Sequence, residues 1–115
     1  MHLSSLAKAK KTKPDMEGAK NIYKQIPISK TDGTPAYSFR VFTIEPGGHT
    51  PHHTHPFEHL NYIIEGHGMV KAQDAEYEIK KGDFAMILPN EPHQYRNTSE
   101  SKPLIMICAV PKEYE

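Results

Sequence analysis

The sequence predicts an all-β fold, either a sandwich or a barrel. Short segments rich in β-branched and aromatic residues recur along the chain, and turn signals such as Asp32-Gly33 and Pro46-Gly47-Gly48 separate them. No segment combines the length of a substantial helix with an apolar period of about 3.6 residues. The 115 residues are enough for one domain with one hydrophobic core.

The first three expected strands differ in how their apolar residues alternate. Residues 21–28 alternate isoleucine with polar residues, which is typical of an edge strand. Residues 36–45 carry β-branched and aromatic side chains on both faces, so we expect both faces to be at least partly covered, and Pro46 is expected to end this strand. Residues 59–65 form the next expected strand, which Gly66 closes.

The following four strands are bounded by turn residues. Residues 69–73 and 76–80 are expected to pair as a hairpin around Asp74-Ala75. Residues 84–88 are apolar and follow a Gly-Asp turn, so they predict a buried strand, and residues 93–97 follow a turn with two prolines.

The last expected strand, residues 104–110, is apolar on both faces. A small monomeric barrel needs only one apolar face, so we expect the other face to pack against a second copy of the chain. The sequence therefore predicts a homodimer.

Residues 1–20 are polar and rich in lysine, with Pro14 and Gly18 interrupting any helical pattern. We expect residues 1–20 to be a leader that can be disordered, and residues 21–115 to form a single domain. The lysines from Lys8 to Lys13 are interpreted as a solvated tail, because a short run of charge without aromatic residues is usually that.

Composition excludes several classes of partner. Lysine plus arginine balance aspartate plus glutamate at 14 each, so no net charge attracts nucleic acid or an anionic membrane. The single cysteine, Cys108, excludes an intrachain disulfide, and no apolar segment has the length of a signal peptide or membrane helix. We expect a cytoplasmic protein whose partner, apart from its own copy, is a small molecule.

Histidines are concentrated in the middle of the chain. His53 and His55 share one face of an extended segment, and His59 keeps the same parity four residues on, so these side chains can converge. Neutral imidazole is the commonest side-chain ligand of divalent transition metals. The pattern indicates a metal site.

Two motifs in this sequence resemble those of the cupin superfamily. Gly47, His53, His55, position 59 and Gly66 fall on the spacing of the first motif, G-x5-H-x-H-x3-E-x6-G. The second motif, G-x5-P-x-G-x2-H-x3-N, is matched at Gly82, His93 and Asn97. The resemblance covers residues 36–111 and implies a double-stranded β-helix, that is, a jelly-roll cupin barrel.

The departures from these motifs are informative. Position 59 is histidine where many cupins have a glutamate ligand, and Glu58 would point to the opposite face of a regular strand. The resemblance therefore implies a four-histidine metal site made of His53, His55, His59 and His93. Asn90 stands where the second motif has glycine, and asparagine tolerates a left-handed turn.

The resemblance also implies one divalent transition metal per chain. By this analogy manganese or iron is favoured, while zinc, nickel and copper are admissible because imidazole binds all of them. Tyr95 and Cys108 are further candidates for the pocket, and Arg40 is either a binder of a substrate carboxylate or a surface residue.

The leading hypothesis is a metal-dependent oxidoreductase of the dioxygenase type acting on a small chelating substrate. No serine or cysteine nucleophile motif and no convincing carboxylate pair occurs, so no catalytic side chain is assigned. Two other classes stay open: a metal-dependent isomerase or decarboxylase of a sugar or keto acid, which needs no dioxygen, and a non-enzymatic cupin module that binds a small molecule.

Overall fold

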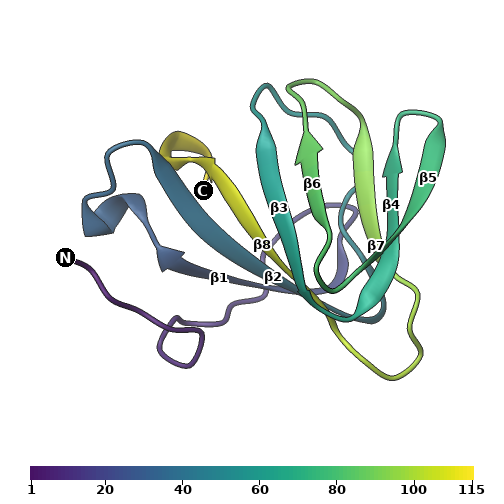
Figure 1. Cartoon of the computed structure of the whole chain (residues 1–115), viewed down its shortest axis with the longest axis horizontal. Coiled ribbons are helices and arrows are strands. Elements are labelled where there is room, and N and C mark those ends of the chain that lie inside the picture. The colour runs from purple at the N-terminus through teal and green to yellow at the C-terminus, as the bar shows by residue number, and fades with distance from the viewer.

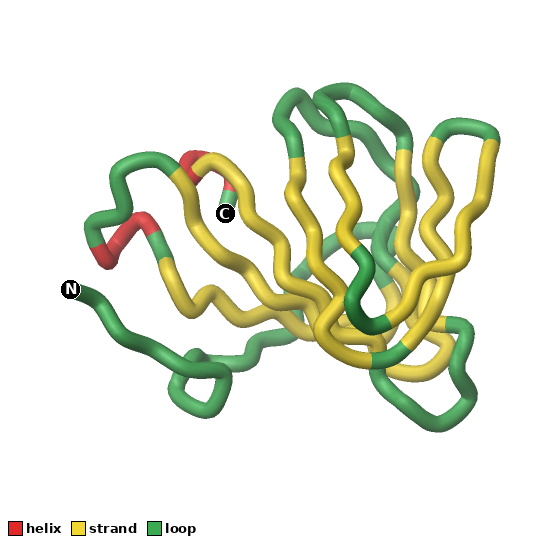
Figure 2. The backbone as a smooth tube through the Cα atoms, viewed as in Figure 1, coloured by secondary structure: helices red, strands yellow, loops and turns green.

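The computed structural model describes all of residues 1–115 and contains eight strands and two short 3-10 helices (Figures 1 and 2). The all-β prediction is confirmed, and each expected strand is present with small differences at its ends. The prediction that the strand at residues 84–88 is buried is wrong, because Phe84, Met86 and Leu88 are 80%, 61% and 50% exposed. The elements are β1 (Lys20–Ile28), η1 (Lys30–Asp32), β2 (Tyr37–His49), β3 (His59–Glu65), β4 (His67–Ala72), β5 (Ala75–Lys80), β6 (Phe84–Ile87), β7 (His93–Asn97), β8 (Leu104–Pro111) and η2 (Lys112–Tyr114).

The strands form one curled antiparallel sheet. Its order is β5-β4-β7-β2-β8-β3-β6, and β1 adds to it by pairing with β2. β1, β2 and β8 form one half of the curl, while β3 to β7 form the other, so the two halves face each other across a shared interior (Figure 1). The predicted jelly-roll barrel is confirmed.

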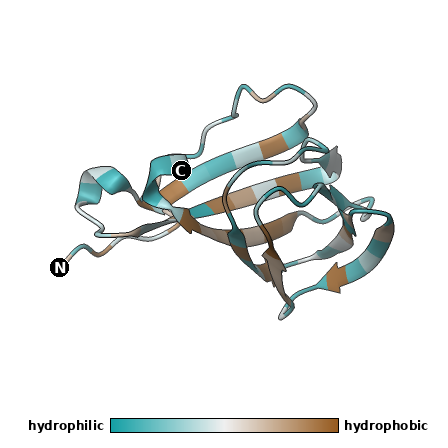
Figure 3. Cartoon of the chain, turned by 90° about the horizontal axis from the view of Figure 1, so that it is seen from above, coloured by the Kyte–Doolittle hydropathy of each residue, from teal (hydrophilic) through white to brown (hydrophobic).

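The core fills this interior from alternate positions of the strands. β2 and β8 pair from Tyr37 opposite Pro111 to Ile44 opposite Leu104, and the alternating side chains of β8 point inward. Hydrophobic residues lie mostly within the strands, and the loops are mostly hydrophilic (Figure 3). The buried apolar cluster consists of Ile22, Phe42, Ile44, Ile63, Val70, Ile79, Tyr95, Leu104, Met106, Cys108 and Val110.

The prediction that Pro46 ends the second expected strand is wrong. β2 continues to His49, because β1 follows it through a bulge: Ile22 faces Ile44, whereas Lys20 faces His49. Gly48 is required in this bulge, since a Cβ atom there would lie 2.7 Å from the carbonyl oxygen of Lys20. The bulge carries β2 to the point where the histidine-rich loop begins.

Two turns bear on the sequence predictions. The β4–β5 hairpin turns one residue earlier than expected, with Ala72 opposite Ala75 and Gln73 in a left-handed conformation with φ of 53°. Asn90 has φ of 64°, so the prediction that asparagine adopts the left-handed turn of the second motif is confirmed.

The segment before β1 lies against that strand. Thr12 forms a backbone bridge with Lys24, and the side-chain amide of Gln25 donates to the carbonyl oxygens of Leu6 and Ala9. The division into a leader and one domain stays a prediction. Neither helical segment has the length and apolar character needed to cross a membrane.

Candidate metal centre

Three histidines of the two motifs are brought together by a backbone bridge between the β2–β3 loop and the start of β7. The amide of His53 donates to the carbonyl of His93 at 3.2 Å, and the amide of His93 donates to the carbonyl of His53 at 3.1 Å. The amide of Asn90 donates to the carbonyl of His55 at 2.7 Å, which joins the turn before β7 to the same loop. Segments distant in the sequence thus present His53, His55 and His93 to one place.

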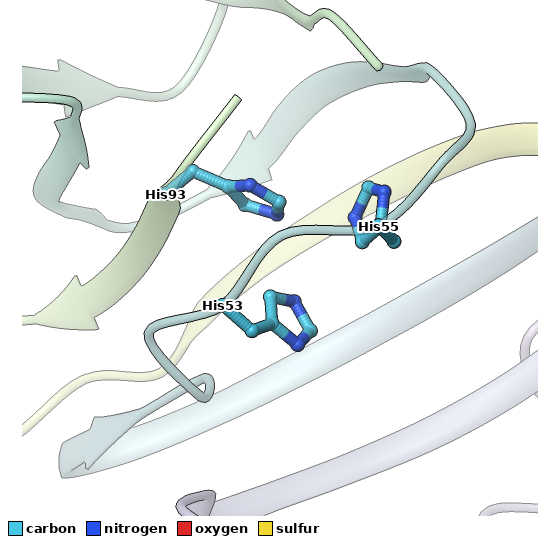
Figure 4. Close-up of side chains that lie close together, drawn as sticks. All are labelled: His53, His55 and His93. Atoms are coloured by element: carbon cyan, nitrogen blue, oxygen red, sulfur yellow. The ribbon is translucent and has the colours of Figure 1, made fainter. Parts of the chain in front are cut away.

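The three imidazoles turn toward a common space (Figure 4). One ring nitrogen from each of His53, His55 and His93 lies within 4.8 Å of those of the other two. Nitrogens bound at right angles to one ion with bonds of about 2.1 Å are about 3 Å apart, so the three imidazoles would draw closer together on binding an ion. These residues could hold a metal ion.

The tautomers of two of these histidines suit metal binding. Nδ1 of His55 lies 2.8 Å from the carbonyl oxygen of Phe57, and Nδ1 of His93 lies 2.8 Å from that of Glu91. A carbonyl oxygen only accepts, so in each ring Nδ1 carries the proton and Nε2 keeps its lone pair. Nε2 of His55 is buried and has no hydrogen-bond partner, which is what a missing metal ligand bond would leave.

Burial keeps the cluster neutral. It lowers the pKa of His53 from 6.5 to about 4, with further contributions from His93 and His55. Burial also lowers the pKa values of His55 and His93. All three rings are therefore unprotonated at neutral pH, as a metal ligand must be.

His59, the fourth predicted ligand, is placed beside the cluster but is bound to another group. It opens β3, is buried, and its ring stacks on that of His55 with centroids 4.2 Å apart. Its Nε2 lies 3.1 Å from the Nη2 atom of Arg40, and it is outside the group of nitrogens within 4.8 Å of one another. Its role as a metal ligand stays a prediction that requires this nitrogen to leave Arg40.

The cluster lines a small interior cavity of about 90 Å³. Drug-sized ligands occupy pockets of about 300 Å³ or more, so this cavity suits a molecule of few atoms. Tyr95 and Cys108 line it, as the sequence suggested, and no aspartate or glutamate does. The lining residues are Met16, Arg40, Phe42, Thr50, His53, His55, Phe57, His59, His93, Tyr95, Met106 and Cys108.

The remaining histidines lie outside the cavity lining. His2, His52 and His67 are exposed, and Nδ1 of His49 contacts the carbonyl oxygen of Thr50.

Sequence reasoning missed several residues that line the cavity, among them Phe57 and Met16. Phe57 stacks on His55 with ring centroids 4.0 Å apart and on Tyr114 with centroids 4.1 Å apart. This stacking fixes the plane of the His55 imidazole. The position of Phe57 between two motif histidines was the available signal. Met16 reaches the cavity from the polar N-terminal segment, where an apolar residue is a weak signal.

Comparisons with known proteins agree with this fold. The chain is 30% identical over 92 residues to the uncharacterized protein MJ1618 of Methanocaldococcus jannaschii, covering 79% of this chain and 66% of that relative, slightly less than two thirds of its length. The polyketide cyclase RemF from Streptomyces resistomycificus superposes with a TM-score of 0.91 at 24% identity, covering 97% of this chain and 80% of that one. A protein described as a predicted oxalate decarboxylase from Thermotoga maritima superposes with a TM-score of 0.81 at 19% identity, covering 95% and 97%.

The structural similarities at these identities show the fold alone. The family assignment rests on the sequence, because the family profile for the cupin domain matches residues 40–110, a range that contains all four motif histidines. The chain therefore belongs to the cupin domain family.

Proposed function

We propose that the chain is a metal-dependent enzyme of the dioxygenase type that acts on a small chelating molecule. The observation that carries the proposal is the buried, unpartnered Nε2 of His55. One ring nitrogen of this residue also lies within 4.8 Å of ring nitrogens of His53 and His93. Such an array of lone pairs next to a cavity is a costly arrangement unless a cation completes it.

Some residues of the cavity would bind the metal, and others would exclude water from it. His53, His55 and His93 would hold the metal, with His59 as the fourth ligand once it leaves Arg40. A divalent transition metal bound there supplies a Lewis acid and, if it is manganese or iron, a redox partner for dioxygen. Phe42, Phe57 and Met106 line the cavity and exclude water from the reacting atoms.

A non-oxidative reaction is the second candidate. The similar structures carry the names of a polyketide cyclase and a predicted oxalate decarboxylase, neither of which implies a dioxygenase. The two candidates are separated by measuring dioxygen consumption together with substrate loss. Turnover that continues at the same rate under argon supports the isomerase or decarboxylase class.

Metal analysis of protein purified without an affinity tag tests the shared basis of both candidates. We expect about one transition metal per wild-type chain and a loss of most of it in His93→Ala, because each ligand contributes strongly to affinity. His52→Ala is the matched control, since His52 is an exposed neighbour of the cluster. A wild type that binds no manganese, iron or zinc on titration would leave only the binding-module alternative.

We also propose that the chain forms a homodimer through the outer face of β3, β6 and β8. Phe84, Met86 and Leu60 on this face are 80%, 61% and 45% exposed. They line a broad hollow of about 650 Å³ together with Phe39, Asn61, Tyr62, Ala85, Ile107 and Ala109. Contiguous exposed apolar surface of this kind marks an interaction site.

A further inference from the structure

Arg40 is a buried positive charge without a negative partner. Its side chain lies on β2, is only 7% exposed and lines the cavity of the histidine cluster. The ion pairs of the chain are His2 with Asp32 and Arg96 with Glu76, and neither involves Arg40. A guanidinium remains charged in proteins, so burying it without a counter-ion is unfavourable.

The hydrogen bonds of Arg40 do not compensate this charge. Nη2 contacts Nε2 of His59 and Sγ of Cys108, each at 3.1 Å, and Nη1 lies 3.5 Å from the carbonyl oxygen of Tyr114. Nε is buried and has no partner. All of its acceptors are neutral, and the stacking of the guanidinium over Phe42 at 5.0 Å offsets only part of the cost.

No carboxylate nearby is available to Arg40. Glu115 follows Tyr114, but its carboxylate accepts hydrogen bonds from Ser29, Ser38 and the amide of Lys30. The cavity itself has no acidic residue, and its histidines are neutral. A divalent metal on these neutral imidazoles would add to the positive charge of Arg40, so the loaded cavity requires an anion.

We propose that Arg40 binds an anionic oxygen of the substrate, and that the substrate is a small organic acid or enolate with a second oxygen directed at the histidine cluster. This assignment rests on the proposed function and specifies its substrate class. The unpartnered Nε and one Nη atom form the fork that pairs with two oxygens of a carboxylate. Cys108 and His59, which now occupy Nη2, are weaker acceptors than a carboxylate.

The proposal can be tested on a side-chain signal of Arg40 itself. The chain contains two arginines, Arg40 and Arg96, so proton–nitrogen correlation spectra contain two arginine Nε–H signals. Arg40→Met identifies the buried one and keeps the apolar stem. Arg40→Lys keeps the charge without the fork, and Arg96→Met is the matched control at an exposed ion pair.

The titrants are pyruvate, oxalate and acetoacetate, with pyruvamide as the neutral counterpart of pyruvate. They are added to metal-free protein and to protein loaded with zinc, which is diamagnetic. We expect the Arg40 signal to shift saturably with at least one acid and not with pyruvamide, while the Arg96 signal stays in place. Affinity for that acid is measured by isothermal titration calorimetry, because the Arg40 variants lack the Arg40 signal. It should fall about 10- to 100-fold in Arg40→Met and partly recover in Arg40→Lys, as for loss of a charge-assisted hydrogen bond.

The outcomes separate this proposal from the metal hypothesis. If zinc does not bind but the Arg40 signal still responds to an acid in the metal-free protein, the metal hypothesis fails and the anion site stands. If zinc binds and no acid moves the Arg40 signal in either form, or if Arg40→Met binds the acids as the wild type does, the anion site is wrong.

Discussion

Acidification should destabilise the metal-free protein, and His59 should account for a defined part of the loss. Burial, followed by the positive charge of Arg40, lowers the pKa of His59 from 6.5 to about 2. Between these two values the unfolded chain carries a proton on His59 and the folded chain does not. The free energy of unfolding therefore rises with pH across this window and falls as the solution is acidified.

The size of the effect follows from the difference between the pH of the solution and the pKa of His59 in the unfolded chain. At pH 5.0, about 1.5 units below that value, His59 alone should cost about 2 kcal/mol, because each unit corresponds to about 1.4 kcal/mol. His53, with its pKa lowered to about 4, adds a contribution of the same sign that solvent screening reduces, since its ring is partly exposed. The lowered pKa values of His55 and His93 act in the same direction.

Urea unfolding in the presence of EDTA, at pH 7.5 and at pH 5.0, measures this loss. Between the two pH values His59→Gln should lose about 2 kcal/mol less than the wild type, because glutamine does not titrate while its amide oxygen still accepts from Arg40. His52→Gln, at an exposed position, should lose as much as the wild type. Equal losses in the wild type and His59→Gln would refute the reasoning.

Three further predictions concern packing and assembly. Gly68→Ala should destabilise the fold by about 3 kcal/mol in urea unfolding, because its Cβ atom would overlap a backbone carbonyl of the neighbouring strand β7, and an unchanged midpoint would contradict this. Tyr95→Phe should cost about 1–3 kcal/mol in the same assay, since the Tyr95 hydroxyl donates to the buried Asn61 at 2.8 Å and the amide would lose its remaining partner. Phe84→Glu should halve the mass measured by light scattering if the outer face forms a dimer, whereas Tyr77→Glu, 57% exposed on β5, should leave the mass unchanged.

The strands could be predicted because alternation and turn residues are local signals. The extent of β2 could not, because its continuation past Pro46 depends on how β1 pairs with it. Gly47, with φ of 75°, is a turn signal in the sequence, yet here it lies within a bulged strand. A bulge is defined by two strands together, and neither strand alone contains it.

The grouping of three histidines was predictable for a related reason. His53, His55 and His93 lie at the spacing of known motifs, and parity places the first two on one face. The alternation of side chains along one strand does not show which residues of the neighbouring strands lie beside them. In the register of the sheet, Cys108 on β8 lies opposite Arg40 on β2 and opposite Asn61 on β3. This arrangement of the three strands places the guanidinium of Arg40 next to His59. The sequence therefore favoured a surface role for Arg40, whereas the structure buries this residue.

The contact between Arg40 and His59 links the two proposals. Neutral His59 has one lone pair on Nε2, so it can accept from Arg40 or bind a metal, but it cannot do both. The guanidinium of Arg40 and a divalent cation held by histidines that line the same cavity would also repel each other. An anion on Arg40 would remove both conflicts, because it replaces His59 as the acceptor and places negative charge between the cations. The four-histidine site and the anion site are therefore expected to favour each other's occupation, and the substrate itself would complete the metal centre.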